Sequence, residues 1–407
     1  ETVKYQSMEP KDAALLAATC VGQFLACHAC GTVLFDVVHT VAHVLPRKAM
    51  LSRWHHYHHK FQGANLKILG QFEAENLTNH LVPEWLTSLV PAAVVAASAT
   101  PLGWVQLTAL TFLVVRSIVF VVAGLIMKGR DSNHVELDKV QVCKNWVLVG
   151  PHYHALHHVF PGQYMSSFVK LLDYILGTAA APLAGRKFVL TGAGGALGGA
   201  FEKRLRAEGA TVHTLKHGKD YARDGEALDH FAYHAVDPAL DALLGACDVL
   251  LLCHGVKSDD MAECVKGNCT SHLALIERYL RCREAARKPN DVMFPEVWGV
   301  GSEAEFHPLI PSEIVCYGKS KRQMMRHAAA YMDRHDMMYR HIVPAAFTSQ
   351  MGPGLVSADW MVRVSLWFIC RGAQYVPASY TPFGYLHWFK MMFVTRIAAA
   401  DTLAKAK

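Results

Sequence analysis

The sequence predicts a helical transmembrane domain with a histidine-rich metal centre, followed by an α/β domain with a Rossmann-like fold. Three observations predict this arrangement. Long apolar stretches dominate the chain before residue 185. The pattern H-x-x-H-H occurs twice in that part, as HHYHH at 55–59 and as HALHH at 154–158. A glycine-rich turn, TGAGGALGG, then follows a short apolar stretch early in the second part, as in folds that bind nucleotides.

The composition favours a membrane protein with two domains. Of 407 residues, 52% are hydrophobic and 18% are charged, and the mean hydropathy of +0.16 is high for a soluble enzyme. The net charge of +6 is spread along the chain, which suits basic residues that flank membrane spans and argues against nucleic acid as a partner. The eleven cysteines form no framework of paired spacings, so we expect reduced thiols in an intracellular compartment.

Three apolar segments are expected to form transmembrane helices, at 13–35, 84–99 and 104–127. The first has about 23 residues, enough to cross ~30 Å of hydrocarbon. A turn signal, SATPLGW, separates the other two, for which a buried helical hairpin is the alternative. Three spans would bring every histidine cluster out on one side of the membrane.

The spacing of the histidines predicts a metal centre. Residues three and four positions apart share a helix face. Three sets of histidines are therefore expected to align: His39 with His43; His55 with His58 and His59; and His154 with His157 and His158. Eight aligned imidazoles exceed the needs of one tetrahedral site, so two metal ions are expected. Imidazole ligands suit both iron and zinc.

The segments HTVAH, WHHYHHK, NHLVPE, PHYHALHHVFPGQY and LLDYILGT resemble the membrane fatty acid hydroxylase and sterol desaturase superfamily over residues 28–178. The resemblance implies a membrane-embedded helical domain with a dimetal centre, usually di-iron. Such a centre uses O2 and supplied electrons to hydroxylate or desaturate lipids. The same eight histidines would be its ligands, with His80 of NHLVPE and His134 of NHVELD as further ones.

The chain departs from this superfamily at one position. Asp138 follows His134 by four residues where relatives carry a second histidine, and it is either a ligand or a solvated loop residue. His56 and His152 lie off the aligned faces. They are expected to help orient the ligands.

The second part begins with a βαβ pattern, RKFVLTGAGGALGGAFEKRLRAEGATVHTL. Gly192, Gly195 and Gly198 let the turn approach a pyrophosphate at a helix N-terminus. Lys216 stands where NAD-preferring folds carry an acidic residue, which favours NADP(H) over NAD(H); a solvated loop lysine is the alternative. Asp237, after the third expected strand, is expected to contact adenine.

A Tyr-x-x-x-Lys pattern, Tyr317 and Lys321 of CYGKSK, follows Ser302 of VGSEAE by fifteen residues. An ammonium group lowers the pKa of a neighbouring tyrosine, whose hydroxyl can then exchange a proton with a carbinol oxygen steadied by the serine. These residues resemble the short-chain dehydrogenase/reductase family over 186–350. The resemblance gives supporting roles to three further residues: Asn268, Gly255 and Thr348. CHG at 253–255 replaces the Asn-Ala-Gly usual in that family.

The sequence thus predicts three segments: a hydroxylase-like domain at 1–184, a nucleotide-binding domain at 185–355, and helices at 356–407 that lie on a membrane or pack on the nucleotide domain. This arrangement resembles the bifunctional sterol desaturase/short-chain dehydrogenase proteins of phototrophs. It implies a lipid-modifying oxidoreductase that acts on a fatty acyl, sterol or isoprenoid substrate and needs an electron donor. The alternatives are a non-catalytic subunit of a larger membrane complex and a reductase whose membrane domain only anchors it. A plastid membrane is favoured, with the endoplasmic reticulum or another organelle membrane as alternatives.

Overall fold

A computed structural model describes residues 10–98, 103–127, 130–136, 140, 145–215, 237–287, 291, 293–306 and 314–391. The chain divides into two compact units, Glu1–Ala179 and Ala180–Lys407, close to the boundary expected near residue 185. Each unit is described by itself. We call them the first and the second unit.

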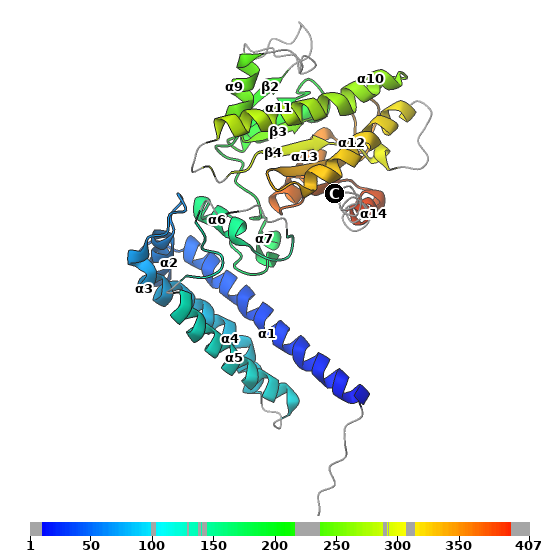
Figure 1. The fold of residues 1–407 in the computed structure, drawn as a ribbon. Coiled ribbons are helices and arrows are strands. Elements are labelled where there is room, and N and C mark those ends of the chain that lie inside the picture. The colour runs from blue at the N-terminus through cyan, green and yellow to red at the C-terminus, as the bar shows by residue number, and fades with distance from the viewer. Residues whose placement is uncertain are drawn as a thin grey trace, which may run out of the picture. The chain divides into compact units, whose positions relative to one another are not determined.

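The first unit is helical. Its helices are α1 (Pro10–Val44), α2 (Met50–Phe61), α3 (Glu73–Asn76), α4 (Val82–Ala96), α5 (Trp104–Met127), α6 (Pro151–Val159) and α7 (Leu171–Leu176). Helices α1, α4 and α5 pack along one another (Figure 1). A side chain at Gly31 of α1 would place its Cβ 2.6 Å from Ser88 Cα of α4, so glycine allows this close approach. A π-helical turn, Leu77–Leu81, joins α3 to α4 and carries His80.

Two described helices are long and apolar enough to cross a membrane, Lys11–Val44 and Trp104–Met127. Only 6% of the most apolar window of each is buried, so their apolar side chains face outward rather than into a protein core. The third expected span, 84–99, corresponds to α4, which has 15 residues. At ~1.5 Å per residue α4 is about 22 Å long and falls short of a ~30 Å hydrocarbon layer.

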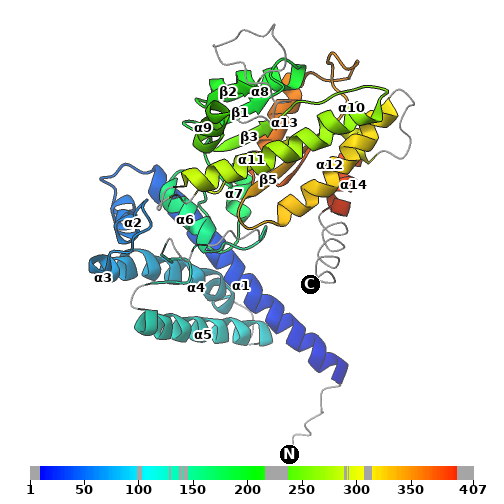
Figure 2. The ribbon, with the colours of Figure 1, turned by 45° about the horizontal axis from the view of Figure 1, so that its top comes forward.

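The second unit contains a six-stranded parallel sheet in the order β2-β1-β3-β4-β5-β6. The strands are β1 (Lys187–Thr191), β2 (Thr211–Leu215), β3 (Val249–Leu252), β4 (Glu296–Val300), β5 (Met338–Pro344) and β6 (Tyr375–Ala378). The helices are α8 (Ala196–Ala207), α9 (Pro238–Ala246), α10 (Met261–Val265), α11 (Ser271–Ala286), α12 (Val315–Asp333), α13 (Ala358–Cys370) and α14 (Pro382–Lys390). Helices α9, α11 and α12 cover one face of the sheet, and α8 and α13 cover the other (Figure 2). The predicted α/β domain is confirmed.

The C-terminal segment does not separate at residue 355 in its described part. Strand β6 pairs with β5, and Met361 and Val362 of α13 lie in the core against the sheet. Residues 358–378 therefore complete the α/β unit, because the sheet needs this strand and helix to cover its edge and face. Helix α14 does leave apolar side chains exposed, Leu386 at 66% and Phe389 at 58%.

A buried ion group stabilises the second unit at the start of β4. Glu296 accepts hydrogen bonds from Arg186 Nη2 at 2.7 Å, from Arg340 Nε at 2.5 Å and from Trp298 Nε1 at 2.8 Å. Replacing Arg340 with methionine is expected to reduce the free energy of unfolding by ~3–5 kcal/mol, because the buried carboxylate loses half of its compensating charge. Urea unfolding of the full chain in detergent measures this change.

The matched control is Arg334→Met, which removes an exposed pair with Asp336 and should cost less than about 1 kcal/mol. Equal effects of the two substitutions would contradict this account.

The ion group also makes stability depend on pH. Although burial alone would raise it, Arg340 and Arg186 lower the pKa of Glu296 to about 2. Because this folded-state pKa lies below the unfolded value of about 4.3, the stabilisation by Glu296 is present above that value and is lost as the pH falls toward 2.

Candidate functional site

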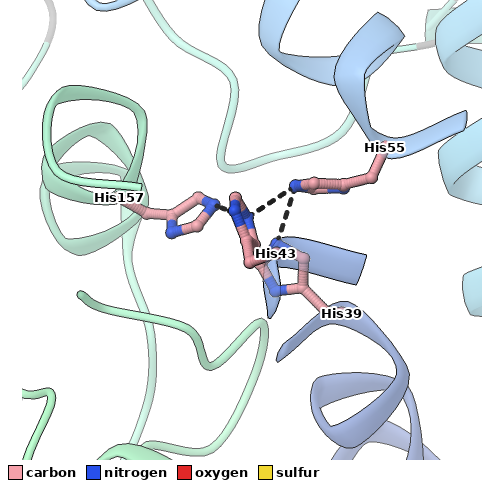
Figure 3. A group of neighbouring side chains, drawn as sticks. All are labelled: His39, His43, His55 and His157. Carbon is pink, nitrogen blue, oxygen red and sulfur yellow. Dashed lines mark hydrogen bonds between the residues drawn. The ribbon is translucent and has the colours of Figure 1, made fainter. Parts of the chain in front are cut away.

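In the first unit, four histidines from three helices converge on one point (Figure 3). They are His39 and His43 of α1, His55 of α2 and His157 of α6. The Nε2 atom of His55 lies 2.8 Å from that of His43 and 3.2 Å from that of His39, and the Nε2 atoms of His43 and His157 lie 3.2 Å apart. We call these residues the first histidine group.

A second histidine group consists of His58, His134, His154 and His158, all of them buried. The Nε2 atom of His154 lies 3.1 Å from those of His134 and His158. His59 lies between the two groups: its Nε2 is 2.9 Å from that of His55, and its ring centroid is 4.8 Å from that of His158. The predicted convergence of the histidine clusters is thus present in the described residues.

The opposite ring nitrogens show how the imidazoles are oriented. Nδ1 of His39 donates to the Met165 carbonyl at 2.7 Å, and Nδ1 of His157 donates to the Gln163 carbonyl at 3.0 Å. A carbonyl oxygen only accepts, so the proton is on Nδ1 and the Nε2 lone pair is bare. In the second group, Nδ1 of His58 lies 2.9 Å from Asn76 Oδ1, and Nδ1 of His134 lies 2.8 Å from Asp131 Oδ1.

These contacts test whether the site fits metal ions. Bare lone pairs that face one another repel unless a cation lies between them. Edges of a tetrahedron with ~2.0–2.1 Å metal–nitrogen bonds are roughly 3.3 Å, close to the observed Nε2 separations. The buried Nε2 of His58 has no hydrogen-bond partner among the described residues. The donor set therefore fits two metal ions, one for each group.

The protonation states agree with this fit. Burial, and then the neighbouring imidazoles, lower the pKa of His58 and His158 well below the ordinary value. Burial likewise lowers the pKa of His154 to about 3. Neutral imidazole is the form that binds metal, so these side chains are ready to act as ligands at neutral pH.

Three other histidines that the sequence analysis singled out lie outside the two groups. His80 is in neither group: its ring stacks on that of His58 at 3.6 Å, and it forms a third group with Glu84 and Asp131. His56 is exposed and His152 is buried. Asp138 lies outside the described residues. Sequence reasoning missed Asn76 and Asp131; the Asp131-x-x-His134 spacing is the signal that could have indicated the latter.

Two buried carboxylates hold the loop at 163–167, which supplies the two carbonyl acceptors. Asp36 of α1 accepts from Ser167 N at 2.8 Å and from Ser167 Oγ at 2.6 Å. Asp173 accepts from Tyr153 Oη, Met165 N and Ser166 N, each at 2.8 Å, and from Thr178 Oγ1 at 2.5 Å. This gives a physical role to the aspartate of LLDYILGT. It fixes the loop that orients His39 and His157.

A cavity of about 800 Å³ opens beside the first histidine group. His43, His55 and His59 line it. Basic side chains also line it: Arg47, Arg53 and Lys60. The first group is therefore accessible from this cavity.

In the second unit, the glycine turn follows β1 and leads into α8. Gly192 has a φ of 72°. A Cβ at Gly192 would lie 2.6 Å from His254 N, and one at Gly198 would lie 2.1 Å from the Gly192 carbonyl oxygen. Both positions thus require glycine. Gly195 precedes α8, whose free backbone N–H groups can bind a phosphate.

Three of the predicted catalytic residues, Ser302, Tyr317 and Lys321, line one cavity of about 770 Å³ together with this turn. Ser302 follows β4, and Tyr317 and Lys321 lie on α12. Ser302 lies beside Tyr317 in the cavity lining, and Lys321 Nζ donates to the Val300 carbonyl at 2.8 Å and lies 5.8 Å from the Tyr317 ring centroid. Burial raises the pKa of Tyr317 to about 12, whereas burial lowers that of Lys321 to about 8.

Asn268 completes this arrangement. It lies on a π-helical turn, Lys266–Thr270, and its Nδ2 donates to the Val256 carbonyl at 2.7 Å and to Ser320 Oγ at 3.0 Å. A Cβ at Gly255 would lie 2.8 Å from Asn268 Oδ1 and 3.6 Å from Lys321 Nζ. The parallel strand order and the glycine turn after β1 decide the fold. The second unit has a Rossmann-like α/β fold, and Ser302, Tyr317 and Lys321 line its cavity.

Comparisons with known proteins add the following. No protein-family model matches the chain. The monoglucosyldiacylglycerol epimerase of Synechocystis sp. is 27% identical over 254 residues, 59% of this chain and 60% of that protein, so the match spans less than two thirds of its length. A short chain dehydrogenase from Burkholderia cenocepacia in complex with NADP is 16% identical, with a TM-score of 0.43 over 54% of this chain and 98% of that one. The RhlG/NADP active-site complex of Pseudomonas aeruginosa is 21% identical, with a TM-score of 0.34 over 42% and 76%.

The remaining predicted cofactor residues of the second unit lie as follows. His254 fills the space between β1 and α11, with Nδ1 2.6 Å from Thr191 Oγ1 and Nε2 2.8 Å from Ser271 Oγ. Thr348 Oγ1 donates to the Gly354 carbonyl at 3.0 Å. Asp237 caps α9, accepting from two backbone N–H groups. An adenine contact by Asp237 remains a prediction, and Lys216 lies outside the described residues.

Replacing Gly195 with valine is expected to weaken NADPH binding by a factor of about ten or more, because the side chain would enter the cavity that the turn lines. The backbone tolerates the change, since its φ of −82° is ordinary and the nearest atom to a Cβ is 3.4 Å away. NADPH fluorescence titration of the full chain measures the affinity. Gly162→Val, at a position with no atom within 4 Å of a Cβ, is the control. Equal affinity in both variants would contradict the predicted role of Gly195.

Proposed function

We propose that this protein is a membrane-bound, lipid-modifying oxidoreductase. Its second unit interconverts an alcohol and a carbonyl with NADP(H), and its first unit holds two metal ions for O2-dependent oxidation of a lipid. The observation that carries the proposal is the placement of Ser302, Tyr317 and Lys321 on the cavity that the glycine turn also lines.

The side chains suit proton transfer at a carbinol oxygen. Bound NADP(H) would accept or supply the hydride. Tyr317 would exchange the proton with the substrate oxygen, and Ser302, which lines the same cavity, would hold the same oxygen in place. The ammonium of Lys321 would favour the ionised form of Tyr317 and so oppose the effect of burial. Asn268 would fix the segment behind Lys321, since it bonds Val256 and Ser320.

A lipid substrate is supported by features of both units. The first unit has two outward-facing apolar helices. In the second unit, Met351 belongs to the cavity lining and is 43% exposed, and Leu355 nearby is 83% exposed. Such side chains suit a substrate with acyl chains that is presented from a membrane surface.

A second candidate activity is epimerisation of a sugar carbon in a glycolipid headgroup, which the similarity to monoglucosyldiacylglycerol epimerase favours. The hydride would leave one face of the carbon and return to the other, with no net oxidation. The same three residues would serve both half-reactions. The two activities differ in whether reduced cofactor accumulates.

The test of the second unit uses the full chain in detergent with NADP+ and either monoglucosyldiacylglycerol or a long-chain alcohol. Accumulation of NADPH with a carbonyl product supports the dehydrogenase activity. An epimerised lipid without NADPH accumulation supports epimerisation. Tight NADPH binding with no turnover of either substrate class would favour the non-catalytic alternative, a structural subunit of a larger membrane complex.

The proposal for the first unit rests on the two histidine groups. Metal ions bound there would supply redox chemistry with O2. The residues that would hold them are the four of each group, with His59 between them. Elemental analysis of the purified full chain is the test, with about two iron ions per chain expected; two zinc ions would support the metal site but contradict the O2-dependent oxidation, because zinc has no redox chemistry. If the wild-type protein holds no stoichiometric metal, the first unit serves only as a membrane anchor.

A further inference from the structure

The two histidine groups differ in charge and in access. We infer that the second group is a closed, charge-compensated site that binds its ion tightly, whereas the first group is an open site whose ion exchanges through the cavity. This inference rests on the proposed metal binding and deepens it. Asp131 then acts as a positioning residue for one metal ion only.

A carboxylate contacts one histidine of the second group. Asp131 Oδ1 lies 2.8 Å from Nδ1 of His134, and the ligand atoms of Asp131, Glu84 and His80 lie within 4.8 Å of one another. An imidazole that donates to a carboxylate is a stronger metal ligand than one that donates to a neutral group.

The first group lacks such an anion at its anchoring contacts. The acceptors for Nδ1 of His39 and His157 are the neutral carbonyls of Met165 and Gln163. Basic residues also line the adjoining cavity, including Arg53 and Lys60. Positive charge there opposes a further cation, so the first group should hold its ion less tightly.

The first group is also more accessible from the cavity than the second group. His43 and His55 of the first group line the cavity of about 800 Å³, and His43 is only half-buried. All four histidines of the second group are buried, and only His158 of them belongs to the cavity lining. A chelator or a substrate in the cavity therefore meets two ligands of the first group but only one of the second.

The experiment follows metal loss from the loaded full chain in detergent, with EDTA as the chelator and elemental analysis as the readout. Two phases are expected, each of about one ion per chain, with the second at least about tenfold slower. Asp131→Asn keeps the side-chain shape but removes the charge, and it should accelerate the slow phase by roughly 10–100-fold and leave the fast phase unchanged. His43→Ala should remove the fast phase alone.

The matched control is Glu73→Gln, a carboxylate near Asp131 in the same unit that pairs with exposed Arg130; both phases should be unchanged. Loss of two ions in a single phase, or equal acceleration of both phases by Asp131→Asn, would overturn the inference while leaving the two-metal proposal standing. Absence of metal from the wild-type chain would overturn both. Thermal unfolding of each variant separates these outcomes from misfolding.

Discussion

Replacing Tyr317 with phenylalanine is expected to lower NADP-dependent turnover by a factor of ~10²–10⁴, because general acid–base catalysis typically contributes that much. The ring remains to fill its place on the cavity wall, so NADPH should bind within about twofold of the wild-type affinity. Only the hydroxyl is removed. Steady-state turnover and NADPH titration of the same preparation measure both quantities.

Tyr380→Phe provides the control. Its hydroxyl donates to the Ala346 carbonyl at 3.0 Å on an exposed part of the same unit, and its removal should change turnover by less than about twofold. A Tyr317 variant with unchanged turnover would refute the proposed chemistry. Loss of NADPH binding in that variant would instead indicate a structural role for the hydroxyl.

The sequence predicted side chains that line the cavity of the second unit because each has a local signal. The Tyr-x-x-x-Lys spacing places Tyr317 and Lys321 on one face of α12, and the glycine turn follows an apolar strand. The buried ion group of Glu296 had no such signal. Its partners Arg186 and Arg340 are distant in sequence and meet only through the register of the sheet. Strand β6 likewise had no local signal, since it joins the sheet by pairing with β5.

In the first unit, helix spacing predicted which histidines align but not which of them share an ion. His55 and His58 lie on one face of α2, yet they belong to different groups. His134 belongs to neither helical pattern and joins the second group from a loop. The division depends on how α1, α2 and α6 pack, which a period of 3.6 residues does not encode. Asp131 and Asn76 were missed because a single polar residue in a loop or helix end has no periodicity.

A second large effect is expected when the loop at 163–167 loses its anchor, Asp173. Asp173→Asn should reduce the free energy of unfolding of the first unit by about 3 kcal/mol or more, because an amide nitrogen would replace one of two oxygens that now accept from buried donors. The backbone N–H groups of Met165 and Ser166 are among those donors. An unpaired buried N–H and a donor facing a donor are both costly.

Asp173→Asn is also expected to weaken metal binding, although Asp173 contacts none of the metal-binding histidines. Once the loop shifts, the carbonyls of Met165 and Gln163 no longer hold His39 and His157 with Nε2 toward the first group. Affinity for the first ion should fall by roughly 10–100-fold, and the second ion should stay. Metal content after dialysis and urea unfolding of the same variant measure the two effects. A destabilised chain that still holds both ions would show that the loop supports the fold without orienting the ligands. Loss of the second ion as well would mean that the two groups depend on a single scaffold.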